Sequence, residues 1–169
     1  ARFVEITDGS GPRYCGTYTA FDGIDINQYL LTTEDFVSFD VGPMAGPAAR
    51  GKGLALFPRR VGGRYLALSR ADRETNALAE SDDLRCWDHA VPLQHPARSW
   101  EVLQLGNCGS PIETDRGWLV LTHGVGPMRT YSIGAILLDI DHPDRVIGAM
   151  AQPLLTPHGS RQDGYVPNV

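Results

Sequence analysis

The sequence has no excess of positive charge. Its 169 residues include 15 Lys and Arg against 20 Asp and Glu, which gives a formal net charge of −5. Nucleic acids and anionic membranes both favour a basic protein surface, because Lys and Arg release their counterions or meet their negative surface potential. The charge balance therefore argues against a general nucleic-acid or membrane partner, and any cationic site must be local.

Long apolar runs are absent as well. No window approaches the roughly 18 to 20 continuous apolar residues that span a bilayer, and the N-terminal residues lack the basic segment and apolar core of a signal peptide. We therefore expect a cytoplasmic location. The sequence also contains no convincing long amphipathic helix.

Cysteines are few, and their spacing forms no motif. Cys15, Cys86 and Cys108 are an odd number without a C-x-x-C pair, so neither a disulfide framework nor a zinc site is indicated. We expect buried free thiols and no metal or organic cofactor. One alternative stays open, a reactive Cys108 exposed by the loop "GNCGSP".

What the sequence does contain is a series of short runs rich in β-branched and aromatic residues. Gly, Pro, Asn and Asp separate them, a pattern typical of antiparallel strands. The runs come in groups of four, and the second run of each group opens at Tyr14, Tyr65 and Trp118, spaced by 51 and 53 positions. Asp35 and Asp83, which follow the third runs, lie 48 positions apart. A four-strand unit repeating about every 50 residues predicts an all-β fold of propeller blades.

The repeat divides the chain into three approximate blades, 1–50, 51–103 and 104–169. Closed propellers usually have about 4 to 8 blades, and three blades alone would expose two sheet edges. We therefore expect the remaining blades of the same propeller to lie outside this chain and to be its partner.

The repeat also predicts a site. In an up-and-down blade, the start of the first strand, the end of the second and the start of the third lie at the same rim. This rim would gather cationic, imidazole and phenol groups together with hydroxyl and amide side chains, a combination suited to an anion and a hydroxyl-rich ligand. Its expected members are Thr19, Asn27, Gln28, Lys52, Arg70, Asn76, Asn107, His123 and Tyr131.

Other charged residues are expected at the opposite rim. Arg59, Arg60 and Arg64 surround the turn between the first and second strands of the second unit, so we interpret them as solvated surface. The turns between third and fourth strands carry an Asp in every unit, and we expect each of these to cap its turn through Asx hydrogen bonds. These residues are Asp35, Asp83 and Asp141.

Several segments, in order, resemble glycoside hydrolase family 130, the β-mannoside phosphorylases and related β-mannosidases. They include "GKGLALFPRRVGGRYLALSR", "GNCGSPIETDRGWLVLTHGV", "YSIGAILLDIDHPDRVIG" and "PLLTPHGSRQDGYVPNV". The resemblance covers essentially all 169 residues. It implies a five-bladed propeller of which this chain supplies roughly the middle three blades.

The resemblance also implies a reaction, the cleavage of a β-mannosidic bond with inversion by inorganic phosphate. A single Asp acts as general acid through a hydroxyl of the bound mannose. By the family's Glu-Asp-(Pro/Ala)-Arg motif, that Asp is expected immediately before Ala1, so we expect the isolated chain to be inactive. Lys52, Arg70, His123 and Tyr131 match the residues that bind phosphate.

Mannose contacts are expected from Asn76, Asn107 and Asp22. One departure from the family pattern is the segment "TAFDGIDINQYLLTT", which has no Arg where many relatives carry one. Asp22 or Asp25 could there act as a base for water or cap a turn. Two alternatives therefore stay open, an inverting β-mannosidase that uses water and a non-catalytic carbohydrate-binding propeller. The linkage, the acceptor sugar and assembly as a homo-oligomer also stay open.

Overall fold

A computed structural model describes residues 2–8 and 11–157 and contains three antiparallel sheets in that part of the chain. The first sheet comprises β1 (Arg2–Asp8), β2 (Gly11–Phe21), β3 (Ile26–Thr33) and β4 (Asp40–Pro43). The second comprises β5 (Ala55–Leu56), β6 (Tyr65–Ser69), β7 (Asn76–Ser81) and β8 (His89–Gln94). The third comprises β9 (Gln104–Asn107), β10 (Ile112–Thr114), β11 (Gly117–Val125), β12 (Tyr131–Leu138) and β13 (Val146–Ala149). Three short 3₁₀ helices lie in the connections, at Pro47–Ala49 (η1), Ser99–Glu101 (η2) and Pro127–Arg129 (η3).

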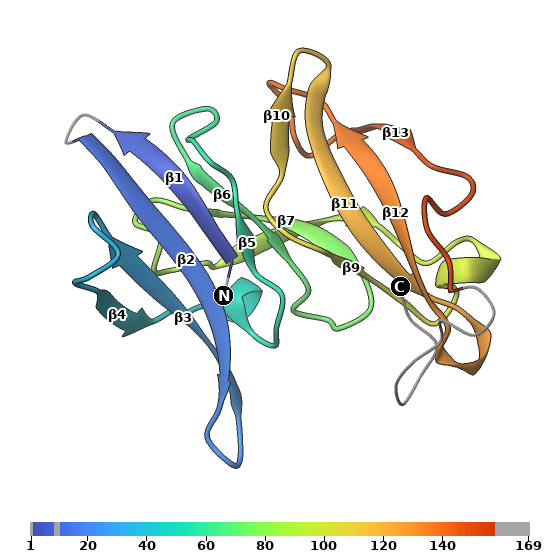
Figure 1. Ribbon diagram of the computed structural model, residues 1–169, viewed down its shortest axis with the longest axis horizontal. Coiled ribbons are helices and arrows are strands. Elements are labelled where there is room, and N and C mark those ends of the chain that lie inside the picture. Colours follow the sequence, from blue (N-terminus) through green and yellow to red (C-terminus); the bar gives the residue numbers. More distant parts are fainter. Residues whose placement is uncertain (1, 9–10, 158–169) are drawn as a thin grey trace.

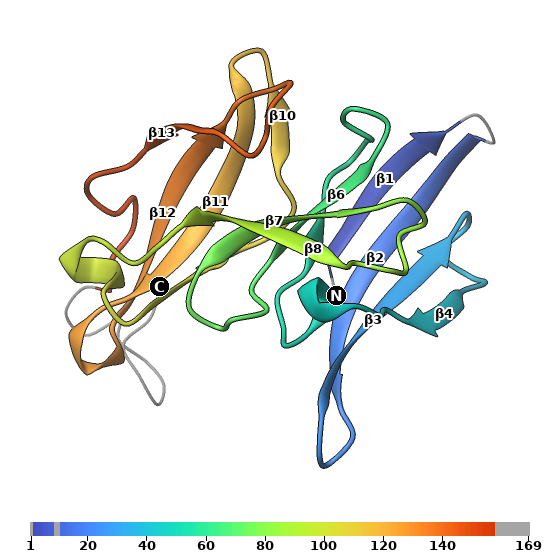
Figure 2. The ribbon, with the colours of Figure 1, turned by 180° about the vertical axis from the view of Figure 1, so that it is seen from behind.

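The prediction of an all-β fold is confirmed. The strands of the first two sheets follow one another in chain order, and the third sheet repeats this order from β10 to β13. Its one addition is β9, which pairs with one end of β11, while β10 pairs with the other end. Figures 1 and 2 show the three sheets side by side, with β5 to β8 between the other two. Closure into a propeller and the number of blades stay predictions.

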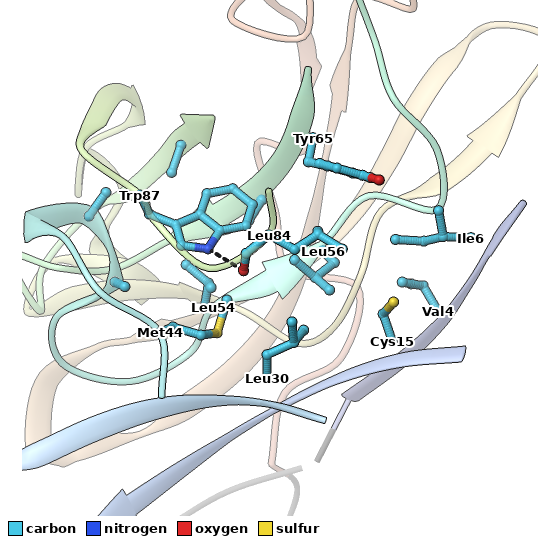
Figure 3. Close-up of a cluster of buried hydrophobic side chains, with 14 residues drawn as sticks. Val4, Ile6, Cys15, Leu30, Met44, Leu54, Leu56, Tyr65, Leu84 and Trp87 are labelled. Carbon is cyan, nitrogen blue, oxygen red and sulfur yellow. Dashed lines mark hydrogen bonds between the residues drawn. The ribbon is translucent and has the colours of Figure 1, made fainter. Parts of the chain in front are cut away.

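Two apolar clusters join neighbouring sheets. The cluster between the first and second sheets is shown in Figure 3, where the indole of Trp87 is fully buried and donates a hydrogen bond to the carbonyl of Leu84 at 2.9 Å. Between the second and third sheets, Phe57 meets Trp118 edge to face with ring centroids 5.0 Å apart. Burial of each such side chain stabilises the fold by roughly 1.5–3 kcal/mol, so the sheets are packed together as one unit.

Backbone and side-chain hydrogen bonds reinforce these contacts. The N–H of Ala45 donates to Arg85 O at 2.8 Å, and the N–H of Trp87 donates back to Ala45 O at 2.9 Å. The hydroxyl of Thr17 reaches across to Leu54 O at 2.6 Å. The first and second sheets are therefore connected by main-chain pairing as well as by burial.

The expected Asx caps are confirmed in the first two sheets. Asp35 accepts from the N–H groups of Val37 and Ser38, both at 2.8 Å. Asp83 accepts in the same way from Arg85 and Cys86, also at 2.8 Å. The next residue in each turn adopts left-handed backbone angles, with φ 57° at Phe36 and 67° at Leu84.

In the third sheet, the choice of Asp141 was wrong. There the capping carboxylate belongs to Asp139, which accepts from the N–H groups of Asp141 (3.0 Å) and His142 (2.9 Å). The position of the capping Asp differs because β12 ends at Leu138, directly before Asp139. β3 and β7 end at Thr33 and Ser81, two residues before Asp35 and Asp83.

The arginines at the opposite rim are partly exposed, but they are not simply solvated. Arg59 pairs with Glu113 of the third sheet at 2.6 Å and covers the ring of Trp118 at 4.8 Å. Arg60 covers the ring of Tyr65 at 4.0 Å. Arg59 therefore connects two sheets, which a reading of the turn alone did not predict.

The cysteine expectation holds for one residue of three. None of the three forms a disulfide, but only Cys15 is buried, while Cys86 and Cys108 are exposed. Among the described residues, no helix has the length and apolar character needed to cross a membrane.

Candidate active site

A pocket of about 540 Å³ lies where strand ends from all three sheets meet. It contains all four residues expected to bind an anion, Lys52, Arg70, His123 and Tyr131. The other residues that line it are Arg2, Thr19, Ile26, Gly51, Gly53, Arg73 and Gln104. The geometric prediction that strand ends of successive units share one rim is therefore correct for these four side chains; their chemical roles stay predictions.

Arg70 and His123 are brought together over a glycine. Gly106 in β9 pairs with His123 in β11. A Cβ added at Gly106 would lie 2.7 Å from His123 Nε2 and 2.8 Å from Arg70 Cζ, which are distances that real Cβ atoms do not show. Both side chains therefore occupy the space that a larger residue at 106 would fill. Tyr131 lies beside them, with its ring centroid 6.1 Å from that of His123.

Arg70 is the most deeply buried cation of the pocket, with 7% of its surface exposed. Its Nη2 donates to Arg73 O at 3.0 Å, while its buried Nε has no hydrogen-bond partner among the described residues. Burial lowers the pKa of this guanidinium from its ordinary value, against the attraction of Asp72 and Tyr131. A desolvated cation with an unused N–H favours binding of an anion, because a charge-assisted hydrogen bond would satisfy both needs.

His123 responds to the same charges. Burial lowers the pKa of its imidazole to about 4, and the positive charges of Arg70, Arg2 and Lys52 add to the effect. The ring is therefore neutral near pH 7 and carries one N–H donor and one acceptor nitrogen. An anion in the pocket would offset these positive charges and raise the pKa of His123 again.

Arg2 is a member of the pocket that the sequence analysis did not assign to it. It opens β1, and burial lowers the pKa of its guanidinium. Its Nη2 donates to Asn107 O at 3.4 Å. It also lines an adjoining pocket of about 470 Å³ with Thr19 and Cys108. The rim rule could have found it, because Arg2 lies at the start of the first strand of a unit.

Three of the predicted amides, Gln28, Asn76 and Asn107, are buried and do not line this pocket. Asn107 is 1% exposed and donates to Gly53 O at 2.7 Å, and Gln28 donates to Gly51 O at 2.8 Å. Both bonds hold the Gly51–Gly53 loop that carries Lys52, the only lysine of the chain. Fully buried Asn76 donates to Gln94 Oε1 at 3.3 Å. Direct contact of Asn76 or Asn107 with a sugar stays a prediction, and the hydrogen bonds present give them a supporting role.

Asp22 does not line the pocket. It lies at the tip of the β2–β3 hairpin, where its carboxylate accepts from the N–H groups of Ile24 (2.9 Å) and Asp25 (2.8 Å) and from the side chain of Asn27 (3.2 Å). These bonds lower its pKa and make it the turn cap that was one of its two expected roles. The general acid expected immediately before Ala1 falls outside the described residues.

The family of the chain follows from sequence comparison. A family profile described as beta-1,4-mannooligosaccharide phosphorylase matches residues 2–169. The chain belongs to glycoside hydrolase family 130. The family expected from the sequence segments is thereby confirmed.

Characterised relatives within family 130 agree with this assignment. A 1,2-beta-oligomannan phosphorylase of Thermoanaerobacter sp. is 38% identical over 120 residues, which cover 70% of this chain and 40% of the relative. A beta-1,2-mannobiose phosphorylase of Listeria innocua is 30% identical over 154 residues, 87% of this chain and 43% of the relative. The structure of a Listeria innocua beta-1,2-mannobiose phosphorylase in complex with beta-1,2-mannobiose superimposes with a TM-score of 0.84 at 28% identity, covering 97% of this chain and 47% of the other. The chain spans less than half the length of these relatives.

Proposed function

We propose that the protein is an inverting β-mannoside phosphorylase whose pocket binds inorganic phosphate beside the mannose that is transferred. The observation that carries this proposal is the meeting of Lys52 and Arg70 from the second unit with His123 and Tyr131 from the third and Arg2 from the first in one pocket. The phosphorylase names of the relatives support the same reaction.

The residues of the pocket fit the needs of a phosphate nucleophile. A phosphate dianion leaves water only where charge-assisted hydrogen bonds replace its hydration, and Lys52, Arg70 and Arg2 can donate them. His123 and Tyr131 can donate to its remaining oxygens. Held in this way, one phosphate oxygen can be directed at the anomeric carbon from the side opposite the leaving sugar. The carbon–oxygen bond to that sugar breaks as the bond to phosphate forms, which inverts the anomeric centre and yields mannose 1-phosphate.

The departing sugar oxygen needs a proton. We place its source in the Asp expected before Ala1, which would pass a proton through a hydroxyl of the bound mannose. Phosphate is then a co-substrate, and no cofactor is required. The cations of the pocket serve the nucleophile, and the acid serves the leaving group.

Hydrolysis is the alternative and makes a different demand. An inverting hydrolase needs a carboxylate base, with its two carboxyl groups roughly 6.5–9.5 Å apart to admit water. In the part of the chain that the structure describes, no Asp or Glu lines the pocket. Asp22, the acidic candidate on the hairpin, has its carboxylate engaged in the turn. The pocket therefore favours an anionic nucleophile.

The proposal extends to the fold. We interpret the three sheets as blades of a five-bladed propeller that closes around the pocket. In support, the two outer sheets expose large apolar side chains, for example Phe3 (40%) and Val41 (48%) in the first and Ile112 (52%) and Leu121 (37%) in the third. Neighbouring blades would cover these side chains.

The test uses the complete natural protein and a β-manno-oligosaccharide, with and without phosphate, and follows the products by ³¹P NMR. We expect turnover only with phosphate and release of mannose 1-phosphate. Arg70→Ala or His123→Ala should raise the KM for phosphate at least about tenfold, since each charged hydrogen bond contributes roughly 1.5–3 kcal/mol. Arg60→Ala, which removes a cation from the opposite rim, is the matched control. Release of free mannose without phosphate would establish hydrolysis instead.

A further inference from the structure

The β2–β3 hairpin extends the wall of the pocket outward. Thr19 and Ile26 line the pocket, and Thr19 pairs with Gln28 while Phe21 pairs with Ile26. Residues two apart on a strand, and residues directly opposite on paired strands, share one face of a sheet. Phe21 therefore lies on the same face as Thr19 and Ile26, one step beyond the mouth. Figure 1 shows this hairpin reaching past the neighbouring strands.

The surface that Phe21 and Ile26 form beyond the mouth of the pocket is apolar and exposed. The side chain of Phe21 is 68% exposed and that of Ile26 is 38% exposed. The aromatic ring and the aliphatic side chain lie directly opposite each other and form a small platform. A ring left this exposed at the edge of a polar pocket is available for a ligand that passes through the mouth.

The platform is held in place before any ligand binds. The carboxylate of Asp22 fixes the tip of the hairpin, and on the opposite face Tyr18 and Tyr29 stack with ring centroids 5.2 Å apart. Gln28 ties the base of the hairpin to the loop of Lys52 through its bonds to Thr19 Oγ1 (3.1 Å) and Gly51 O (2.8 Å). A preorganised surface loses little conformational entropy on binding, so even a small contact can contribute affinity.

We propose that Phe21 and Ile26 bind the acceptor-side sugar of the manno-oligosaccharide, the part of the substrate that leaves when phosphate attacks. This inference rests on the proposed function. If phosphate and the transferred mannose occupy the cationic end of the pocket, the rest of the chain leaves by the mouth, beside Phe21. The C–H groups on one face of a pyranose carry partial positive charge and pack well on the negative face of an aromatic ring.

The small size of the platform favours a sugar over a protein partner. A stable protein interface buries about 800 Å² on each side, and two side chains beside a pocket offer far less. A single sugar ring matches the pair in size. Its hydroxyl groups can stay in water while one face of the ring is covered.

The test separates acceptor binding from phosphate binding. In the complete protein, run in the synthetic direction with mannose 1-phosphate as donor, Phe21→Ala should raise the KM for a mannobiose acceptor about tenfold, equivalent to about 1.4 kcal/mol. The KM for mannose 1-phosphate and kcat should stay within about twofold of wild type, and Phe21→Tyr should restore the acceptor KM. Phe39→Ala is the matched control, because it truncates another exposed Phe, in the β3–β4 connection, that lines a different cavity.

The possible outcomes distinguish this inference from the function on which it rests. An unchanged acceptor KM in Phe21→Ala, beside normal wild-type phosphorolysis, would overturn the platform and leave the proposed function intact. If the wild-type protein shows no phosphate-dependent turnover, the proposed function fails, and calorimetric titration with mannotriose decides the platform. Weaker binding by Phe21→Ala then supports it, and equal or absent binding overturns it. A lower oligomeric mass in Phe21→Ala with an unchanged acceptor KM would assign the hairpin to contact between copies and also overturn it.

Discussion

Gly106→Ala is the sharpest test of the pocket, because a single methyl group should displace two of its members at once. The new Cβ would lie 2.7 Å from His123 Nε2 and 2.8 Å from Arg70 Cζ. The nearest atom is His123 Cε1 at 2.4 Å, and ordinary contact begins at 3.4 Å, so His123 or β9 must move by about 1.0 Å and Arg70 by about 0.6 Å. Gly106 is not among the glycines with positive φ, so Ala adds no backbone strain of that kind.

The expected cost falls mainly on activity. Overpacking destabilises a protein by about 1–3 kcal/mol, and a misplacement near 1 Å can lower the rate about 100-fold. We therefore expect Gly106→Ala to fold, to melt a few degrees lower, and to lose at least about tenfold in kcat/KM for phosphate. The assay is phosphorolysis at varied phosphate concentration, with thermal unfolding measured in parallel.

Gly109→Ala provides the matched control for this experiment. It makes the same change three residues away, where an added Cβ meets nothing within 4 Å, and it should behave as wild type. If Gly106→Ala folds and keeps the wild-type KM for phosphate, then Arg70 and His123 do not position the anion. In that case, the reasoning from the pocket to phosphate binding is wrong.

Two further predictions concern protonation and turns. The unfolded chain binds a proton at His123 near pH 6.5 and the native protein only near pH 4, so protons favour unfolding between these pH values. The melting temperature should therefore fall as pH drops from about 6.5 to 4. His123→Asn should make this fall less steep. An equally steep fall in the variant would show that other groups cause it. In the β12–β13 turn, Asp139→Ala should lower the melting temperature and Asp141→Ala should not, since Asp139 accepts the two turn hydrogen bonds. A lower melting temperature in Asp141→Ala and not in Asp139→Ala would show instead that Asp141 caps the turn, as the sequence predicted.

The sequence repeat predicted the pocket because it gives the positions of the strand ends, and alternate strand ends of each unit lie at the same rim. Lys52, Arg70, His123 and Tyr131 could be found in this way without any contact information. Arg73 could not, because it enters the pocket from the loop between β6 and β7, whose path depends on tertiary packing. Gln104 could not either, because it opens β9, a strand that the four-strand repeat did not include. Asn76 and Asn107 were placed at the correct rim but not at its surface. Whether an amide faces ligand or core depends on neighbouring sheets, which a strand pattern does not contain.

The residue types within one unit also did not predict cysteine exposure or the contacts between units. The exposure of Cys86 and Cys108 follows from turns and loops at sheet edges, where small apolar residues need not be covered. The ion pair of Arg59 with Glu113 joins residues 54 positions apart, and each of them alone is typical of solvated surface. Periodicity therefore defined the units, while the contacts between units required coordinates.

The distribution of unsatisfied polar atoms connects the fold to its function. Among the buried atoms without a hydrogen-bond partner in the described structure, Arg70 Nε is a donor whose residue lines the pocket. An unpaired buried donor of this kind costs roughly 1–3 kcal/mol, and the clustered positive charges that depress the pKa of His123 add repulsion. The apolar clusters around Trp87 and Trp118 offset this cost from the interior of the sheets. A site that binds an anion must leave donors unpaired until the anion arrives. The residues proposed to bind phosphate therefore lower the stability of the unliganded protein.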